Sequence, residues 1–253
     1  ESEDDAAHAL DLLLHDASAW SKASAQGINR VLTCHTYRHR FARICELAGV
    51  SVPAEVQPLL SVTVSVRQKT ELDAVADSLA DQSYRQFEVH LFTMCDLSAS
   101  DVENFRRRIG GNAVTLWRMT AAQQDVFDDF LRKARGSLLC NIRSDWLYSS
   151  AYFADCVMFF MIPGVHILGK RCHFVAGLDG HVTVTAVDDE YRMLNMAPSG
   201  TIAVRKNSVT ADMLDRILTE SVFKIRDDAI FSTYRYNCLE CPANMVRPRN
   251  DMW

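Results

Sequence analysis

The chain has 253 residues, of which 48% are hydrophobic and 23% are charged, a composition typical of a globular protein with a substantial buried core. The formal net charge of −5 argues against nucleic acids and anionic membranes as partners, because both attract basic proteins. No apolar run approaches the roughly 18 residues of a membrane-spanning helix, so we expect no transmembrane segment.

Residues 4–48 predict two helices separated by Gly27, because apolar residues recur at helical spacing on both sides of it. The second predicted helix is rich in arginine and histidine, which indicates a solvated or interdomain face. A proline-marked linker is predicted at residues 51–58. Because the chain begins with Glu rather than Met, we expect it to be a fragment whose N-terminus need not be a domain start.

From Leu59 onward, strand and helix patterns alternate. The repeat of about 25 residues is typical of a parallel, doubly wound sheet. Right-handed crossovers would place the carboxyl ends of its strands on one edge. Four strands are predicted, at residues 59–66, 87–95, 113–119 and 137–142.

The second half predicts a mixed or antiparallel region. A helix is expected over Tyr148–Phe160, and residues 164–193 predict two strands joined by an Asp-Gly hairpin turn. A further strand at residues 200–206 and a capped helix at residues 208–221 follow, and then an irregular tail. The predicted fold class is therefore α/β, a mostly parallel sheet with a mixed second half and an N-terminal helical appendage.

The eight cysteines are scattered, and most lie in apolar runs where a free thiol behaves as a small hydrophobe. This distribution favours a reducing, cytoplasmic location over a disulfide framework. Cys238 and Cys241 form one C-x-x-C pair, and a structural zinc would need two more ligands. Cys172 and His173 could complete such a set, but nothing in the sequence brings them close, so thiols without a metal are the favoured interpretation.

Several motifs carry a resemblance to a known family. The segment SLADQSYRQFEV (residues 78–89) matches SLxxQSYxxFEV, and CDLSASD (residues 95–101) stands in place of DDGSxD. With these motifs, residues 59–239 resemble family 2 glycosyltransferases of the GT-A fold, whose D-x-D corresponds here to Arg143-Ser144-Asp145. The first 50 residues, with RVLTCHTYRHRFARI (residues 30–44), resemble the last helices of CgeB-type glycosyltransferases, which can precede a family 2 module. The resemblance implies that residues 1–50 are the tail of such a preceding module.

The resemblance implies a nucleotide-sugar donor at the strand ends and a divalent cation, Mn²⁺ or Mg²⁺, on Asp145. Two interpretations of Arg143 stay open. Its guanidinium either replaces the cation by binding phosphate bidentately, or it forms a surface ion pair with Asp145 in a site that has lost activity. For Asp96 and Ser98, the alternative to donor binding is that they only cap the helix that follows them. The donor-binding residues implied are Val66, Arg67, Asp96, Ser98, Arg143 and Ser144.

Asp212 and Asp215 lie in the last predicted helix, near where the family carries its catalytic base, and are the candidates for that role. Residues 188–190, all acidic, compete with them, and the usual "ED" pair of the family is absent. An ordinary solvated helix face is the alternative for both aspartates.

The resulting hypothesis is a glycosyltransferase that moves a sugar from a nucleotide-sugar donor to a glycan or other hydroxyl acceptor. Surface polysaccharide assembly is the expected process, with a partner glycosyltransferase module in the same chain. The alternative is a degenerate, non-catalytic GT-A module that binds glycan or acts as an interdomain scaffold. The broken D-x-D favours the alternative, while the retained Gly169-Lys170 and Gly200-Thr201 framework fits both.

Overall fold

The computed structural model describes residues 2–51, 57–119, 123–179, 181–227, 229–234 and 238–241. The chain divides into two compact units, Glu1–Val56 and Gln57–Trp253, which are described separately below. Within the described residues, no helix combines the length and the hydropathy needed to cross a membrane.

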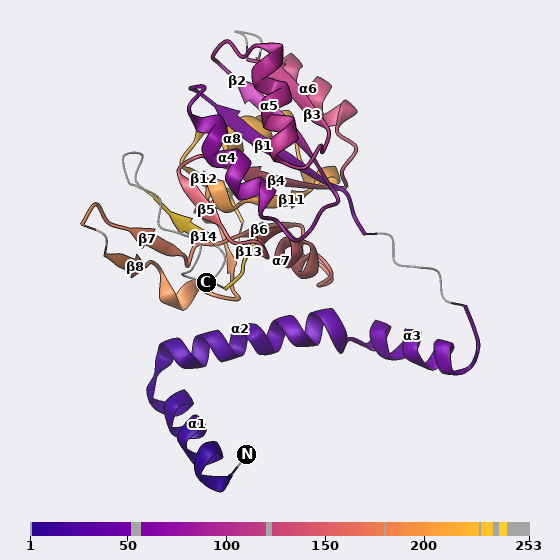
Figure 1. The fold of residues 1–253 in the computed structure, drawn as a ribbon, viewed down its shortest axis with the longest axis vertical. Helices are drawn as coiled ribbons and strands as arrows, with labels where there is room; N and C mark the ends of the chain where they lie inside the picture. Colours follow the sequence, from indigo (N-terminus) through magenta and orange to yellow (C-terminus); the bar gives the residue numbers. More distant parts are fainter. Residues whose placement is uncertain are drawn as a thin grey trace. The chain divides into compact units, whose positions relative to one another are not determined.

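The described part of the first unit is helical, with α1 (Glu3–His15), α2 (Ala17–Cys34) and α3 (Tyr37–Leu47) (Figure 1). The two predicted helices are therefore three, and Gly27 lies inside α2 rather than at a break. The breaks fall at Asp16, whose carboxylate accepts the first backbone N–H groups of α2, and at Thr36, the N-cap of α3. A glycine inside a helix costs only about 1 kcal/mol, and the first boundary is set instead by the capping carboxylate of Asp16.

The second unit is built on an eight-stranded sheet in the order β3-β2-β1-β4-β11-β6-β13-β9. Strands β1 to β4 are parallel, whereas β11 runs antiparallel to both β4 and β6. The elements of this unit that are used below are β1 (Leu60–Val66), α4 (Glu71–Ala80), β2 (Phe87–Thr93), α5 (Ala99–Arg108), β3 (Val114–Arg118), α6 (Gln123–Lys133), β4 (Leu138–Ile142), β5 (Trp146–Tyr148), α7 (Tyr152–Phe159), β6 (Ile167–Gly169), β7 (Phe174–Ala176), β8 (Val182–Val184), β9 (Met193–Leu194), η2 (Ser199–Thr201), β11 (Ala203–Arg205), α8 (Ala211–Thr219), β13 (Ile230–Ser232) and β14 (Cys238–Glu240). Strands β10 (Met196–Pro198) and β12 (Val222–Lys224) form a separate two-stranded sheet.

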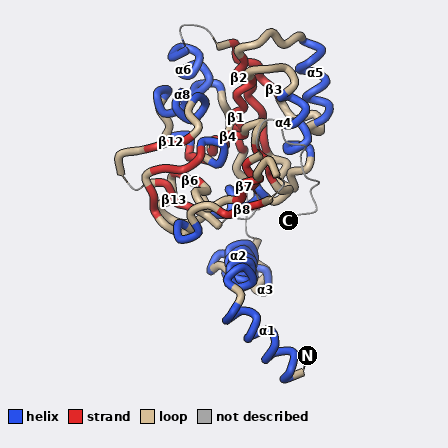
Figure 2. Tube along the Cα trace, turned by 90° about the vertical axis from the view of Figure 1, so that its left-hand side faces the viewer, coloured by secondary structure: helices blue, strands red, loops and turns tan. Residues whose placement is uncertain are grey.

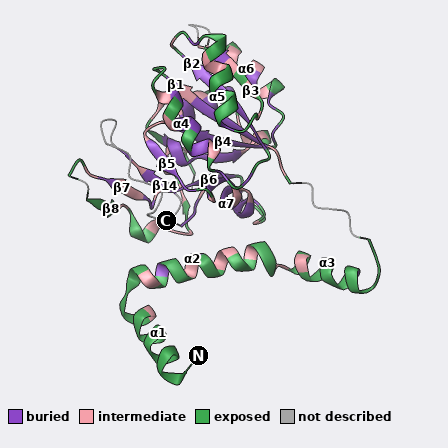
Figure 3. Cartoon of the chain, viewed as in Figure 1, coloured by how far each residue is buried: buried purple, intermediate pink, exposed green. Residues whose placement is uncertain are grey.

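Helices cover both faces of the parallel half, as Figure 2 shows. Right-handed crossovers put α4 and α5 on one face, and α6 and α8 lie on the other. Strands β2 and β4 are wholly buried (Figure 3). Beneath α6, Phe92 packs edge-on against Phe130, and Phe127 joins the same cluster. Because both faces are covered, polar residues of β1 and β2 such as Ser61, Glu88 and His90 are buried as well.

A four-stranded sheet in the order β5-β14-β7-β8 follows the end of β4. The hairpin predicted at Asp179 joins β7 and β8, which pair antiparallel. The helix predicted from Tyr148 begins only at Tyr152, because Trp146–Tyr148 is the strand β5. Part of the predicted irregular tail is the strand β14, between β5 and β7. Short strands such as these carry no alternation that a sequence pattern can reveal.

Candidate functional site

The carboxyl ends of the parallel strands meet at one edge of the sheet. Val66 at the end of β1 pairs with Thr93 at the end of β2, and Val64 pairs with Ile142 at the end of β4. The loops that follow these strands therefore lie together, as the crossover argument predicted. In open α/β sheets this edge is where ligands bind.

The loop after β1 contains two of the predicted donor-binding residues. Val66 is buried, and the side chain of Arg67 is exposed. The backbone N–H of Arg67 donates to the Glu71 carboxylate at 2.7 Å, which fixes the turn into α4. The Arg67 guanidinium is thus presented to solvent at the ligand edge.

The loop after β2 contains Asp96 and Ser98. The Asp96 side chain is 98% exposed and accepts a hydrogen bond from Arg118 at 3.1 Å. Ser98 is the N-cap of α5 and forms a capping box with Asp101. The capping role considered for Ser98 is therefore present, and Asp96 is left at the surface of the same loop.

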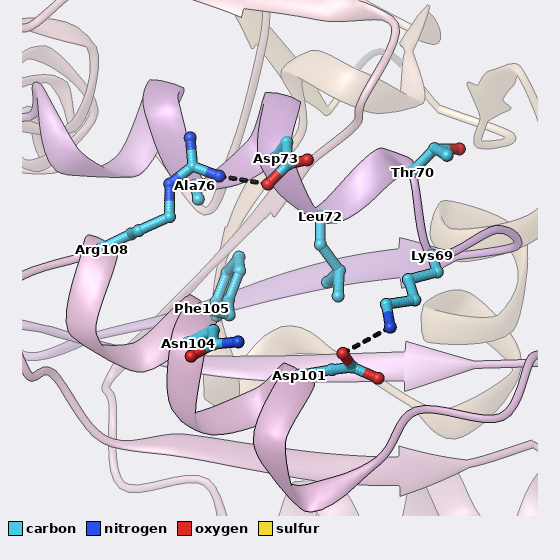
Figure 4. Close-up of a pocket in the computed structure, with 9 residues that line it drawn as sticks. All are labelled: Lys69, Thr70, Leu72, Asp73, Ala76, Asp101, Asn104, Phe105 and Arg108. Atoms are coloured by element: carbon cyan, nitrogen blue, oxygen red, sulfur yellow. Dashed lines mark hydrogen bonds and ion pairs between the residues drawn. The ribbon is translucent and has the colours of Figure 1, made fainter.

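A cleft of about 330 Å³ opens between α4 and α5 beside these loops (Figure 4). Leu72 and Phe105 are apolar lining residues, and Lys69 reaches across to Asp101 at 2.6 Å. Hydrogen bonds from Lys69 and then Ser98 lower the pKa of Asp101 to about 2. Arg108 makes an ion pair with Asp73 on the opposite helix. Each of these charged groups already has a partner of opposite charge.

The loop after β4 holds a bidentate ion pair. Arg143 donates from Nε to Asp145 Oδ1 at 2.9 Å and from Nη2 to Oδ2 at 2.7 Å. Both side chains are partly buried, at 21% and 31% exposure. The hydrogen bonds to Asp145 raise the pKa of the Arg143 guanidinium above its ordinary value, against the opposing effect of burial. Ser144 lies between the two residues in the turn that leads into β5.

A fully buried tyrosine fixes the backbone of this loop. Tyr148 Oη accepts the backbone N–H of Arg143 at 3.0 Å and donates to the carbonyl of Gly200 at 2.7 Å. A Cβ on Gly200 would lie 3.0 Å from the Trp146 ring and 3.1 Å from Arg143 Cδ. Burial raises the pKa of Tyr148 well above its usual range. The Gly200 turn and the Arg143 loop are therefore held in close contact by one neutral phenol.

The small sheet places Glu240, which the sequence did not single out, beside His173, which the sequence raised only as a possible zinc ligand. Glu240 on β14 pairs directly with Trp146 on β5, and its Oε2 lies 3.2 Å from His173 Nε2. The rings of Trp146 and His173 are 4.9 Å apart. No motif marks Glu240, because its position depends on the pairing of strands that are far apart in sequence.

The same pairing brings the cysteine pair beside the segment that could have completed a zinc site. Leu239 on β14 pairs with Phe174 on β7, so Cys238 lies next to His173 along the ladder. Their side chains do not converge, because Cys241 packs in an apolar cluster while His173 faces Glu240. Burial raises the pKa of the Cys238 thiol to about 12, which opposes the thiolate form that zinc requires.

The residues at the end of β4 do not fit a resident divalent cation. Asp145 supplies the lone carboxylate of the former D-x-D, and both its oxygens accept hydrogen bonds from Arg143. The guanidinium places positive charge where a cation would sit. In the described residues, no group of three or more His, Cys, Asp or Glu side chains is arranged to hold a metal ion.

The predicted base residues lie on α8. Asp212 is exposed, and Asp215 is half-buried with an Oδ1 atom that has no hydrogen-bond partner among the described residues. Burial, and then the charges of Asp212 and Glu220, raise the pKa of Asp215. The strand before α8 leaves the sheet at the amino end of β4, where Arg205 pairs with Leu138. Asp212 and Asp215, in the first turns of α8, are therefore not brought together with Arg143.

The competing acidic residues are placed differently. Asp189 Oδ2 pairs with Arg171 Nε at 2.7 Å, and Asp188 is exposed in the same short 3-10 helix. Glu190 is the residue at which that helix ends.

The parallel strands, the switch to antiparallel pairing after β4 and the strand-end cluster define a GT-A-like α/β fold, so the predicted fold class is confirmed. No family model and no curated protein matches the sequence. The structure is similar to residues 1–349 of TarS from S. aureus, with a TM-score of 0.51, 14% identity and coverage of 72% of this chain and 60% of that one.

Further solved structures are similar at a comparable level. TarS 1–349 in complex with UDP-GlcNAc gives a TM-score of 0.49 at 12% identity, covering 77% of this chain and 61% of that one. The mannosyltransferase PcManGT from Pyrobaculum calidifontis, in complex with GDP-Man and Mn²⁺, gives 0.48 at 13% identity, covering 88% of this chain and 70% of that one. The chain thus spans about 60% of the TarS fragment.

Proposed function

We propose that the second unit binds a nucleotide-sugar donor at the carboxyl ends of β1, β2 and β4 and transfers its sugar to a glycan or other hydroxyl acceptor. The finer assignment is a family 2 glycosyltransferase acting in surface polysaccharide assembly, preceded by a CgeB-type partner module. The motifs of residues 78–89 and 95–101 support it.

The observation that carries the proposal is the Arg143 guanidinium at the end of β4. It is mostly withdrawn from solvent, it lies at the ligand edge of the sheet, and its partner Asp145 is 31% exposed. In the proposal the donor diphosphate displaces Asp145 from Arg143. A guanidinium presents two parallel N–H groups that match phosphate oxygens. In this proposal Arg143 binds the donor diphosphate and stabilises the charge that develops as it leaves, with little dependence on a divalent cation.

The other predicted residues would surround the nucleoside. The exposed Arg67 and Asp96 side chains project from neighbouring loops at the same edge. Asp96 would accept hydrogen bonds from a base or ribose, and Arg67 would meet a phosphate. Val66 and Ser98 would form the floor and wall of that pocket, and Ser144 would lie beside the diphosphate. Asp212 or Asp215 stays the sequence-based proposal for the base, with the raised pKa of Asp215, caused first by burial, as its support.

A specific observation favours a second function. The only carboxylate of the former D-x-D is neutralised by its neighbour, as in a site that no longer holds a metal. A non-catalytic GT-A module that binds glycan or positions a partner module is therefore the competing proposal. The two differ in whether nucleotide binds.

Calorimetric titration of UDP, GDP and their hexose derivatives, with Mn²⁺ and with EDTA, tests the transferase proposal. We expect one nucleotide to bind at micromolar to low millimolar concentration in both buffers. Absence of binding for all of them at millimolar concentration would leave the non-catalytic module as the better account. An Asp145→Ala change that alters neither binding nor turnover would remove Asp145 from the site.

A further inference from the structure

Glu240 and His173 lie beside the Arg143 loop on one face of the small sheet. Glu240 is directly opposite Trp146, and the backbone N–H of Cys241 donates to the carbonyl of Asp145 at 2.8 Å. The charge of Glu240 contributes to the raised pKa of Arg143, after the larger contributions of Asp145 and Tyr148 and against the opposing effect of burial. The carboxylate of Glu240 therefore shares the electrostatic environment of the proposed diphosphate site.

The hydrogen bonds of His173 fix which of its ring nitrogens faces Glu240. Nδ1 lies 2.9 Å from the carbonyl oxygen of Arg171 and 3.2 Å from that of Lys170. Carbonyl oxygens only accept hydrogen bonds, so Nδ1 carries a proton. Nε2 is left to meet Glu240 Oε2 at 3.2 Å. For Nε2 also to donate to an ionised Glu240, the ring must carry a proton on both nitrogens, so the arrangement inferred here is an imidazolium paired with the Glu240 carboxylate.

The His173 side chain is buried, whereas the Glu240 side chain is partly exposed to solvent. The side chain of His173 is 6% exposed, whereas that of Glu240 is 45% exposed. Oε1 of Glu240 has no hydrogen-bond partner among the described residues. One carboxylate oxygen is thus held from behind by a buried imidazole, and the other is open to a ligand.

The other acidic groups near this edge either form an ion pair already or lie on an element outside the Arg143 loop. Both oxygens of Asp145 accept from Arg143. Asp96 pairs with Arg118 and is almost fully exposed. Asp215 lies on α8, whose Ile217 carbonyl accepts a hydrogen bond from Asn141 near the end of β4 at 3.3 Å, and its Oδ1 has no hydrogen-bond partner among the described residues. Glu240 is therefore the best-placed described carboxylate for proton transfer next to Arg143.

We propose that Glu240 is the catalytic base that takes the proton of the acceptor hydroxyl, and that His173 is the residue that positions it. This inference rests on the proposed function and names the base of that same site. A carboxylate in this role needs to reach a sugar hydroxyl or water on the side of the donor away from the diphosphate.

The proton and electrons balance without a further reactant. The oxygen of the acceptor hydroxyl forms a bond to the anomeric carbon as its O–H bond breaks. The bond from that carbon to the diphosphate oxygen breaks, and the nucleoside diphosphate leaves with the electron pair beside Arg143. Oε1 of Glu240 receives the proton and later releases it to solvent.

The test compares Glu240→Gln with Glu220→Gln in the full chain. Glu220 is a close match, because it is 43% exposed and lies 3.2 Å from Arg216 Nε, but it is at the end of α8. Release of UDP or GDP from UDP- and GDP-linked hexoses, with water as the acceptor, gives the rate, and calorimetry gives the nucleotide affinity. A lost general base costs about 100-fold or more in kcat.

We expect Glu240→Gln to lose about 100-fold in kcat with nucleotide affinity unchanged within about threefold. His173→Gln should lose roughly tenfold in kcat with the same nucleotide affinity, because Glu240 is still present but is no longer held in place. Glu220→Gln should behave as the wild type.

If Glu240→Gln keeps the wild-type rate, or if Asp215→Asn loses about 100-fold in kcat and Glu240→Gln does not, Glu240 is not the base. The transferase proposal would stand in either case. A wild-type chain that binds no nucleotide would instead overturn the transferase proposal. One that binds nucleotide and releases none from its sugars would contradict both, in favour of the non-catalytic module.

Discussion

At the scale of single residues, the site depends on how one arginine is held. Arg143 contacts Asp145 through its guanidinium and Tyr148 through its backbone, so its orientation is fixed at two points. A glycine at position 200 permits this orientation of Arg143, because the Cβ of any other residue would press against Arg143 Cδ and the Trp146 ring. The sequence identified Arg143 and Asp145, but it gave no sign of Tyr148 as their support.

Two neighbouring tyrosines offer a matched test of that support. The Tyr148 and Tyr152 rings are 4.8 Å apart and both are buried, but Tyr152 Oη has no hydrogen-bond partner among the described residues. Tyr148→Phe should weaken nucleotide binding about tenfold, because it removes the link between Arg143 and Gly200. It should also speed amide hydrogen exchange at Arg143, a readout that needs no ligand.

Tyr152→Phe likewise removes a buried phenol oxygen, next to Tyr148, and should change neither the nucleotide affinity nor the exchange rate of the Arg143 amide. Equal effects of the two variants, or an Arg143 amide whose exchange is unchanged in Tyr148→Phe, would contradict a positioning role for Tyr148.

At the scale of secondary-structure elements, a buried carboxylate joins three segments of the parallel half. Glu88 on β2 accepts from Ser61 on β1 at 2.8 Å and from the backbone and side chain of Arg135, after α6, at 2.7 and 2.8 Å. Burial alone would raise the pKa of Glu88, but these hydrogen bonds outweigh it and lower the pKa to about 2. Glu88 thus stabilises the fold in its ionised form.

The sign of the pH dependence follows from that pKa. The folded state holds Glu88 ionised more strongly than the unfolded state, so the stabilisation is present above the ordinary pKa of 4.5 and is lost as the pH falls toward 2. The neighbouring His90 acts in the same direction, since burial lowers its pKa and the unfolded chain takes up its proton first.

Glu88→Gln should therefore lower the free energy of unfolding at pH 7 by about 2 to 3 kcal/mol, and it should flatten the loss of stability between pH 5 and pH 3. Urea unfolding at pH 7, 5 and 3 measures both effects. Glu103→Gln is the control, because Glu103 forms only an exposed pair with Arg106. A pH dependence of Glu88→Gln that matches the wild type would show that other groups govern acid unfolding.

The elements also show what the sequence can and cannot predict. The strands β1 to β4 and the helices between them were predictable, because each is a long run buried on one or both faces. In the small sheet only the β7–β8 hairpin was predictable, because β5 and β14 are three residues each and β14 pairs with strands far away in the chain. Glu240 and its contact with His173 were missed for the same reason, since their proximity depends entirely on the pairing of β14 with β7.

At the scale of the whole molecule, the two units differ in how they bury apolar surface. The second unit has a continuous core. In the first unit, the buried residues among those described are Ser21, Ala25 and Cys45, whereas Tyr37 is 88% exposed and Leu47 is 73% exposed. Stability therefore resides in the second unit, and helices of this kind gain most of their stability from packing.

A chain that begins at Gln57 should therefore fold cooperatively and bind nucleotide with the affinity of the full chain, within about threefold. Urea unfolding and calorimetry of this fragment measure the two properties. A fragment that folds but has lost affinity would assign part of the site to the first unit, against the present account.

The account turns on whether Arg143 supplies the positive charge for a nucleotide diphosphate. Calorimetric titration of UDP and GDP into the wild type and Arg143→Gln, each with Mn²⁺ and with EDTA, addresses this directly. The account predicts wild-type binding that EDTA changes by less than about twofold and that Arg143→Gln weakens by about 10- to 100-fold, the worth of charge-assisted hydrogen bonds. Binding that EDTA abolishes and Arg143→Gln leaves intact would contradict it.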